Sequence, residues 1–192
     1  SKVRKQLPDL PRKNIIGEPC GRDTCAAVAL SAAIVRSRSE NGVMAVLPAD
    51  HFIASETEFR RVLLDSMYFA KSEMALITIG IKAEEPSTGY GYIQVGKKIR
   101  RDISRSLKST FFNVKRFVEK PNLSKAKGYL KSGNYRWNAG MFIWSCAAIS
   151  EELKRQQPKL YLAVERWSSI SSLSKLNSVL SADYPKLNKK SV

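Results

Sequence analysis

Apolar runs of strand length alternate with segments of helical periodicity in the first part of the chain. This alternation predicts, in order, a strand over 14–18, a helix from Asp23 or Thr24 to about Arg36, a strand over 43–47, a helix to about Lys71 and a strand over 75–80. Strands that alternate with helices are typical of a parallel sheet with crossover helices. We therefore expect an α/β fold built on such a sheet.

The helix that precedes residue 71 carries a start signal. Ser55 is followed by Glu58 at the spacing of a capping box, in which each side chain bonds to a backbone N–H group of the other residue. Apolar residues then recur at helical spacing. They predict an inner face made of Phe59, Val62, Leu63 and Met67.

The pattern changes after residue 82. We expect a turn-rich loop over 86–91 and strands over 92–95 and 111–118, joined by an exposed basic segment over 97–108. The rest of the chain predicts a helix over 123–131, a strand over 137–144, a helix over 146–156 opened by Ser145, a helix beginning at Pro158 and an amphipathic helix over 169–180.

Composition places the chain among ordinary globular domains. Its 192 residues are enough for one domain with a sizeable core, and 43% of them are hydrophobic. The excess of 33 Lys and Arg over 17 Asp and Glu gives a formal charge of +16, which favours polyanions or anionic substrates as partners. Because the basic residues are spread and no nucleic-acid-binding motif accompanies them, we expect no nucleic-acid partner. A basic nucleic-acid-binding module is the alternative.

Cysteine usage and hydropathy bear on the compartment. Cys20, Cys25 and Cys146 are odd in number and lack the spacing of a zinc site or a disulfide framework, which favours a reduced, cytoplasmic location. The longest apolar stretch, over 25–35, is too short to span a bilayer, and no signal peptide opens the chain. We therefore expect no membrane partner. The oligomeric state stays open, with a homo-oligomer among the alternatives.

The most informative stretch is Val43 to His51. Its apolar run stops at Pro48, and Asp50 is the first charged side chain after it. In open α/β sheets ligands bind beyond the carboxyl ends of the strands, so Asp50 is placed to hold Mg²⁺ against phosphate oxygens. An equally supported interpretation is that Asp50 caps the following helix. The single histidine, His51, is expected to be structural or to support Asp50 rather than to act as a base.

Four further polar segments each have a functional and a structural interpretation. They are Glu18–Thr24, a turn into a helix N-terminus that suits an anion; Thr88–Tyr92, whose glycines permit close approach of a ligand; Glu119–Pro121, with a carboxylate and an ammonium at a strand end; and Trp137–Met141, with an amide beside small residues. Taken singly, each is explained as well or better by an ordinary helix start, a tight turn, a surface ion pair or a core turn.

Together and in this order, the segments EPCGRDT, LPADH, TGYGYI, RFVEKP and WNAGMF resemble the bacterial-type mannose-1-phosphate guanylyltransferases, within the sugar nucleotidyltransferase superfamily. The resemblance extends from about Ile15 to Val192. It implies a single partial domain over 1–192 with a Rossmann-like nucleotide-diphospho-sugar transferase fold, incomplete, in which a mostly parallel mixed sheet is flanked by helices. Residues 14–82 would form the nucleotide side and residues 83–192 the sugar side.

The resemblance also implies a reaction and its residues. The reaction is attack of mannose 1-phosphate on the α-phosphate of GTP with Mg²⁺, giving GDP-mannose and pyrophosphate. Asp50, as the metal ligand, and Lys120 would be catalytic. The nucleotide would be bound by Glu18, Arg22, Asp23, Thr24, Pro48 and Ala49, and the sugar by Gly89, Tyr90, Gly91, Glu119, Asn138, Ala139 and Gly140. Such chemistry needs positioning and charge neutralisation more than a covalent protein group.

By the same resemblance the chain corresponds to the middle of the enzyme. The family's glycine-rich triphosphate loop would precede it, and a later aspartate that binds metal would follow it. Asp23 stands where many relatives have Asn. On this interpretation the 192 residues alone are inactive. A catalytically idle truncated product is a further alternative.

Overall fold

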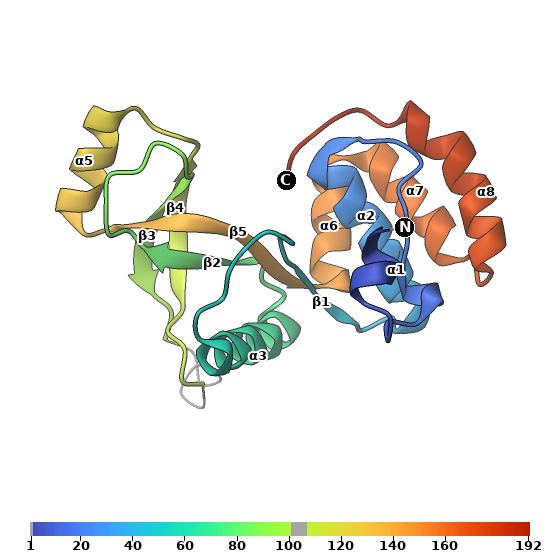
Figure 1. The fold of residues 1–192 in the computed structure, drawn as a ribbon, viewed down its shortest axis with the longest axis horizontal. Coiled ribbons are helices and arrows are strands. Elements are labelled where there is room, and N and C mark those ends of the chain that lie inside the picture. The colour runs from blue at the N-terminus through green and yellow to red at the C-terminus, as the bar shows by residue number, and fades with distance from the viewer. Residues whose placement is uncertain (1, 101–106) are drawn as a thin grey trace. The chain divides into compact units, whose positions relative to one another are not determined.

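The structure is a computed structural model that describes residues 2–100 and 107–192 (Figure 1). Its helices (α), 3₁₀ turns (η) and strands (β) follow in this order: α1 (Lys2–Gln6), η1 (Arg12–Asn14), α2 (Asp23–Arg38), β1 (Val43–Val46), α3 (Glu56–Glu73), β2 (Ile77–Lys82), β3 (Tyr92–Lys98), β4 (Phe112–Val118), α5 (Leu123–Ser132), β5 (Tyr135–Ser145), α6 (Cys146–Gln156), α7 (Pro158–Ser168), α8 (Leu173–Asp183) and η2 (Tyr184–Lys186). They form two compact units. We call Val43–Ala148 the sheet unit, and Ser1–Gly42 with Ile149–Val192 the helical unit.

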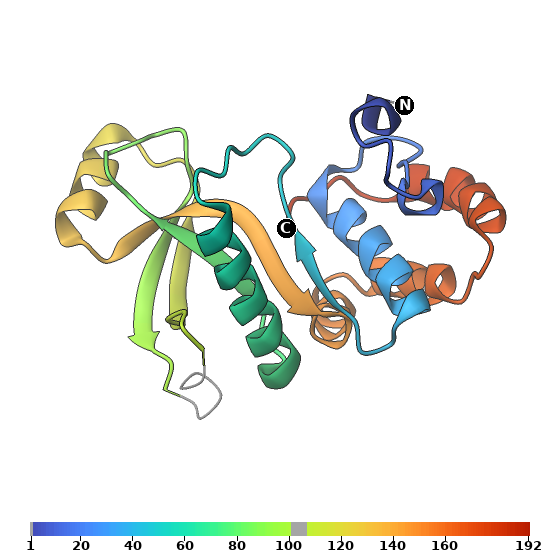
Figure 2. The same cartoon turned by 60° about the horizontal axis from the view of Figure 1, so that its bottom comes forward.

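β5 is the central strand of the sheet unit, and every strand pair in the described residues is antiparallel. On one edge of β5, β1 pairs with its carboxyl-terminal part, and β3 pairs with its amino-terminal part. β2 pairs along the opposite edge, since Ile143 faces both Ala45 of β1 and Ile77 of β2. β4 extends the sheet beyond β3, and α3 packs against β1 and β5 (Figure 2).

The prediction of a mostly parallel sheet is therefore wrong, although the α/β class with flanking helices is confirmed. β1 and β2 do run in the same direction and are joined by α3, as the alternating pattern indicates. However, β5 lies between them and runs opposite to both. Sequence periodicity reveals a crossover helix but not a strand from later in the chain that separates the two strands it joins.

The expected strand over 14–18 is also wrong. η1 covers 12–14, and the residues that follow it are irregular. An extended segment becomes a strand only when a neighbour supplies hydrogen bonds, and the helical unit contains no strand among its described residues. The other predicted helices and strands are confirmed to within a few residues. Residues 101–106 of the expected basic excursion lie outside the described residues.

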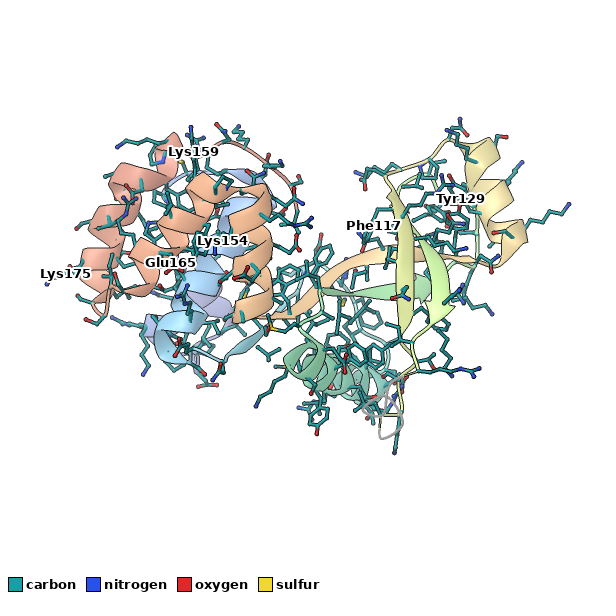
Figure 3. The ribbon with its side chains drawn as sticks, turned by 180° about the vertical axis from the view of Figure 1, so that it is seen from behind. Phe117, Tyr129, Lys154, Lys159, Glu165 and Lys175 are labelled. Carbon is teal, nitrogen blue, oxygen red and sulfur yellow. The ribbon has the colours of Figure 1, made fainter. Side chains whose placement is uncertain are left out.

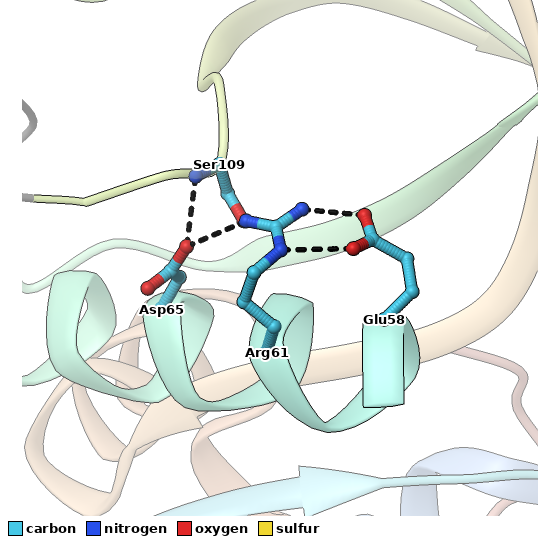
Figure 4. A network of polar contacts seen from close by, with 4 residues as sticks. All are labelled: Glu58, Arg61, Asp65 and Ser109. Atoms are coloured by element: carbon cyan, nitrogen blue, oxygen red, sulfur yellow. Dashed lines mark hydrogen bonds and ion pairs between the residues drawn. The ribbon is translucent and has the colours of Figure 1, made fainter. Parts of the chain in front are cut away.

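The capping box at the start of α3 does not form. Ser55 is the N-cap residue, but its side chain makes no capping hydrogen bond. Glu58 is instead bound by Arg61, whose Nε donates to Glu58 Oε2 at 2.9 Å (Figure 4). Arg61 also donates to Asp65 and Ser109, and Asp65 accepts the backbone N–H of Ser109 at 2.8 Å. This network attaches α3 to the segment that leads into β4.

The inner face of α3 extends further than expected. The predicted residues Phe59, Val62, Leu63 and Met67 are half-buried. The deepest positions are Ser66, Phe69 and Ala70, and the Phe69 ring stacks on Phe111 with centroids 4.2 Å apart.

Aromatic packing fixes α5 against the sheet. Tyr129 of α5 stacks on Tyr135 at 3.9 Å between ring centroids and contacts Tyr92 at 5.4 Å (Figure 3). Asn122 caps the helix by accepting the Lys125 N–H at 3.0 Å, and Gly133 ends it in the left-handed conformation. A left-handed residue at a helix end reverses the chain sharply, so β5 starts beside the stacked tyrosine rings.

The helical unit is built on α2, whose buried residues are mostly alanines. Alanine is the strongest helix former and lets a neighbouring helix approach closely, and α2 packs against α7. Arg36 of α2 forms an ion pair with Glu165 of α7 (Figure 3). None of the helices formed by residues 2–100 and 107–192 has the combined length and apolar character that a bilayer crossing needs.

Two glycine substitutions are expected to change stability in opposite directions. A Cβ on Gly96 of β3 would lie 2.8 Å from the Asn113 carbonyl oxygen, so β3 and β4 must shift apart and Gly96→Ala should cost about 1–3 kcal/mol. Gly128, inside α5, has no atom within 4 Å of the corresponding position. Gly128→Ala should therefore gain up to about 1 kcal/mol from helix propensity. Urea unfolding measures both, and a wild-type midpoint for Gly96→Ala would contradict the described β3–β4 packing.

The substitution Glu165→Gln is expected to lower stability near neutral pH and to have no effect in acid. A hydrogen bond from Arg36 holds the pKa of Glu165 below its ordinary value. The pair therefore stabilises the fold above the ordinary carboxyl pKa, and this contribution is lost as pH falls through the lowered value. Because the two side chains are 29% and 37% exposed, we expect only about 0.5 kcal/mol. Thermal unfolding between about pH 7 and pH 3 measures the difference, which must disappear at the acid end.

Candidate functional site

Asp50 lies in the loop between β1 and α3 and is exposed. The N-cap of α3 is Ser55, so the interpretation of Asp50 as a helix cap is wrong. Within the described residues the Asp50 carboxylate has no hydrogen-bond or ion-pair partner, and His51 beside it is also exposed. The carboxylate is therefore open to a ligand from outside the chain.

The β5 strand bulges where the segment WNAGMF crosses β2. Thr78 lies opposite Phe142 and Gly80 opposite Asn138, so residues 139–141 of β5 face a single residue of β2. Gly140 makes this possible by adopting a φ of +65°, which side chains disfavour. Pro48, just before Asp50, lies 3.6 Å from the position that a Cβ on Gly140 would take. The two motifs LPADH and WNAGMF thus touch.

Gly91 and Glu119 lie next to this bulge. The Gly91 carbonyl oxygen accepts the backbone N–H of Asn138 at 2.8 Å. A Cβ on Gly91 would be 3.0 Å from Glu119 Oε2 and 3.7 Å from the Asn138 Cβ. The absence of a side chain at Gly91 therefore gives the Glu119 carboxylate its place beside Asn138.

Lys120 has an unusual backbone for a long side chain. Its φ is +35°, and its Nζ lies 3.6 Å from Glu119 Oε1, with both side chains mostly exposed. An exposed ion pair of this kind contributes little stability, whereas positive φ at a bulky residue costs about 1–3 kcal/mol. The ion pair therefore does not account for the conformation. We call Gly91, Glu119, Lys120, Asn138 and Gly140 the bulge cluster.

The tyrosine loop, residues 87–92, borders the bulge cluster. The Tyr90 ring is half-exposed and tilted against Trp137 with centroids 5.0 Å apart. Ser87 holds the loop, because its hydroxyl accepts the Gly89 N–H at 3.2 Å and its carbonyl oxygen accepts the Tyr92 hydroxyl at 2.9 Å. Of the expected sugar contacts, Ala139 differs: its side chain is buried, so only its backbone is left to meet a ligand.

The expected nucleotide motif at the start of α2 is engaged within the helical unit. The Arg22 guanidinium donates to the carbonyl oxygens of Gly21, Tyr184 and Pro185. Thr24 Oγ1 accepts the Val192 N–H at 3.0 Å, and the Cys25 N–H donates to the Lys190 carbonyl oxygen at 3.0 Å. The segment 184–192 therefore binds the Arg22 guanidinium, the Thr24 hydroxyl oxygen and one backbone N–H, that of Cys25, at this helix N-terminus.

Two side chains of the motif have other roles. Glu18 accepts a hydrogen bond from the hydroxyl of Tyr184. Burial and this hydrogen bond raise the pKa of Tyr184. Asp23 is exposed and has a φ of +58°. After glycine, Asn and Asp tolerate such an angle best, so an Asp suits the backbone at this position.

Two residues of the site were missed by sequence reasoning. The Thr78 hydroxyl lies 3.1 Å from Asn138 Oδ1 and 3.2 Å from the Met141 carbonyl oxygen, and its single hydrogen is shared between these two acceptors. Trp137 was part of a recognised motif but was not assigned a contact. The only signal for Thr78 was a hydroxyl inside an otherwise apolar strand.

A cavity of about 580 Å³ lies between α3 and the sheet, away from most of these residues. Apolar side chains such as Phe69, Ile79 and Ile93 form much of its wall, and no carboxylate is among its described lining residues. It offers no ligand for a hard cation, so its size does not make it the candidate site.

Comparison with known proteins identifies a family whose profile matches most of the chain. The family profile described as "Nucleotidyl transferase" matches residues 2–174. Mannose-1-phosphate guanylyltransferase of Escherichia coli (strain K12) is 41% identical over 169 residues, or 85% of this chain and 34% of the relative. Mannose-1-phosphate guanylyltransferase ManC of Salmonella typhimurium is 40% identical over 168 residues, with the same coverage. The crystal structure of mannose-1-phosphate geranyltransferase from Thermus thermophilus has a TM-score of 0.80 and 30% identity, covering 99% of this chain and 50% of that chain.

The chain thus spans 34% of the length of these two curated relatives. All five segments that carry the resemblance lie inside the matched residues 2–174, and the resemblance is confirmed. The chain belongs to the nucleotidyl transferase family.

Proposed function

We propose that the chain is part of an enzyme that joins GTP and mannose 1-phosphate into GDP-mannose and pyrophosphate. The two guanylyltransferase relatives support this substrate pair, each over 85% of the chain. The observation that carries the proposal is the bulge cluster, where a carboxylate, an ammonium and a half-buried amide gather around two glycines. A sugar phosphate offers hydroxyls and an anion, which match these groups.

In the proposed reaction an oxygen of the sugar phosphate attacks the α-phosphorus of GTP. A new P–O bond forms while the bond from the α-phosphorus to the α–β bridging oxygen breaks, and that electron pair leaves with pyrophosphate. The attacking phosphate is already an anion at neutral pH, so no general base is needed. The protein contributes positioning and charge neutralisation.

Each group of the bulge cluster has a matching task. The Glu119 carboxylate accepts hydrogen bonds from sugar hydroxyls, and the Lys120 ammonium offsets charge on the phosphate. The Tyr90 and Trp137 rings offer an apolar wall to the sugar ring. We attribute the positive φ of Lys120, for which its exposed ion pair does not account, to the placement of its ammonium group toward the phosphate.

Mg²⁺ is proposed as the cofactor, with Asp50 as its ligand in this chain. No group of three or more His, Cys, Asp or Glu side chains that could hold a metal occurs among residues 2–100 and 107–192. A single open carboxylate nevertheless fits Mg²⁺, which commonly takes one or two carboxylates together with waters and substrate phosphates. The cation would neutralise charge on the triphosphate during the transfer.

The nucleotide is assigned to the motif at the start of α2, by resemblance. Arg22 and Thr24 are bonded to the segment 184–192, so they reach a nucleotide only if those hydrogen bonds are exchanged. Asp23 is exposed beside them. A helix N-terminus favours anionic groups, which suits a nucleotide once its donors are released.

The substitution Asp50→Asn is expected to lower turnover about 100-fold in the protein at its natural length, because the negative charge that faces the cation is lost. The melting temperature should not change, because Asp50 has no hydrogen bond or ion pair with another described residue to lose. The assay is pyrophosphate release from GTP and mannose 1-phosphate over a range of Mg²⁺ concentrations. Asp9→Asn, at another exposed carboxylate, is the matched control. Wild-type turnover in Asp50→Asn would show that Asp50 has no part in the reaction. Pyrophosphate release that occurs only with another nucleotide or another sugar phosphate would overturn the proposed substrate pair.

The substitution Gly91→Ala is expected to raise the KM for mannose 1-phosphate with little change in stability. The new Cβ would meet Glu119 Oε2 at 3.0 Å, and a flexible carboxylate end moves more easily than backbone. We expect an increase of about tenfold, since the displaced group is the acceptor for sugar hydroxyls. Steady-state kinetics test this, with Gly128→Ala as the control. An unchanged KM would show that the position of Glu119 does not matter for the sugar phosphate.

A further inference from the structure

The bulge of β5 removes backbone groups from the sheet ladder. Residues 139–141 have one residue of β2 opposite them, so the Gly140 N–H and the Met141 carbonyl oxygen need partners other than a neighbouring strand. The structure supplies both partners from side chains. The Gly140 N–H donates to Asn138 Oδ1 at 3.1 Å, and the Met141 carbonyl oxygen accepts from Thr78 Oγ1 at 3.2 Å.

These contacts determine which end of the Asn138 amide is free. A backbone N–H can only donate, so the amide atom that faces Gly140 must be the oxygen. The Thr78 hydroxyl donates to the same oxygen at 3.1 Å. Oδ1 thus accepts two hydrogen bonds, whereas the Nδ2 group has no acceptor within the described residues.

The free amide nitrogen belongs to a residue in the middle of the bulge cluster. Asn138 is held from its backbone by Gly91, and its Cβ and the Glu119 carboxylate both border the space above Gly91. A donor and an acceptor on neighbouring residues can bind one hydroxyl group, which accepts from the first and donates to the second. Reversal of the amide would place two acceptors there and lose this complementarity.

We propose that Thr78 is a positioning residue that fixes the Asn138 amide, so that Nδ2 is the group a ligand hydroxyl or phosphate oxygen meets. The proposal rests on the proposed function for the identity of the ligand, a phosphorylated sugar. Thr78 itself touches no substrate. Its hydroxyl acts on the ligand through Asn138, and its contact with the Met141 carbonyl oxygen only completes the hydrogen bonding of the bulge.

Kinetics of the protein at its natural length test the proposal with three variants. Thr78→Val keeps the shape and removes the donor, and it should raise the KM for mannose 1-phosphate about tenfold with unchanged kcat and unchanged KM for GTP. Thr78→Ser keeps the hydroxyl and should restore the wild-type KM. Asn138→Asp keeps an oxygen at both Oδ1 contacts but replaces the Nδ2 donor with a charged acceptor near Glu119, so it should raise the same KM.

The double variant Thr78→Val with Asn138→Asp distinguishes positioning from general structure. If Thr78 acts by orienting the amide, its removal has no further effect once the amide donor is gone, so the double variant should match Asn138→Asp. A KM in the double variant that equals the product of the two single effects would overturn the proposal. A lowered melting temperature with a wild-type KM in Thr78→Val would overturn it as well.

A spectroscopic readout separates this proposal from the substrate assignment. In ¹⁵N-labelled protein the Asn138 side-chain NH₂ signals, identified by their loss in Asn138→Asp, should be two resolved resonances. They should shift or broaden in Thr78→Val and return in Thr78→Ser. Absence of turnover in the wild type would overturn the proposed function, while identical NH₂ signals in wild type and Thr78→Val would overturn the role of Thr78.

Discussion

The bulge of β5 is the constraint on which the sheet unit and its candidate site depend. Among the described residues β5 is the strand that pairs with β1, β2 and β3, so an irregularity in it affects the neighbouring strands on both of its sides. Gly140 supplies the positive φ that the bulge needs, and the displaced backbone lets Asn138 Oδ1 accept the Gly140 N–H. A regular strand would satisfy its own backbone groups and leave the amide without a fixed orientation. The binding groups therefore follow from a local failure of the sheet ladder.

The two units use their polar residues differently. In the sheet unit Asp50 is exposed, Glu119 has only an exposed ion pair with Lys120, and the Asn138 amide nitrogen has no acceptor among the described residues; Gly91 lies against both Glu119 and Asn138. In the helical unit, Glu18, Arg22 and Thr24 are bound by the segment 184–192. A formal charge of +16 favours anionic ligands in general, but it does not select among them. Selection has to come from open groups in fixed positions.

Sequence reasoning identified most helices and strands because their periodicity and capping signals are local. Ser145 opens α6 as expected, with its hydroxyl accepting the Ala148 N–H at 3.1 Å. Strand order was not accessible in this way, because β5 inserts between β1 and β2 from a distant part of the chain. The capping box failed for a similar reason, since Arg61 competes for Glu58 and also reaches Ser109. The site motifs could be identified from their residue types, whereas the contacts of Thr78 exist only because β5 bulges opposite it. The single domain over 1–192, Mg²⁺ and the residue roles stay predictions.

The central claim is that the bulge cluster binds the sugar phosphate. A crystal structure of the protein at its natural length with mannose 1-phosphate tests this most directly. We expect sugar hydroxyls on the Glu119 carboxylate and the Asn138 Nδ2 group, with the phosphate near the Lys120 ammonium. Sugar phosphate bound without contact to Glu119 or Asn138, for example in the cavity of about 580 Å³ between α3 and the sheet, would contradict it.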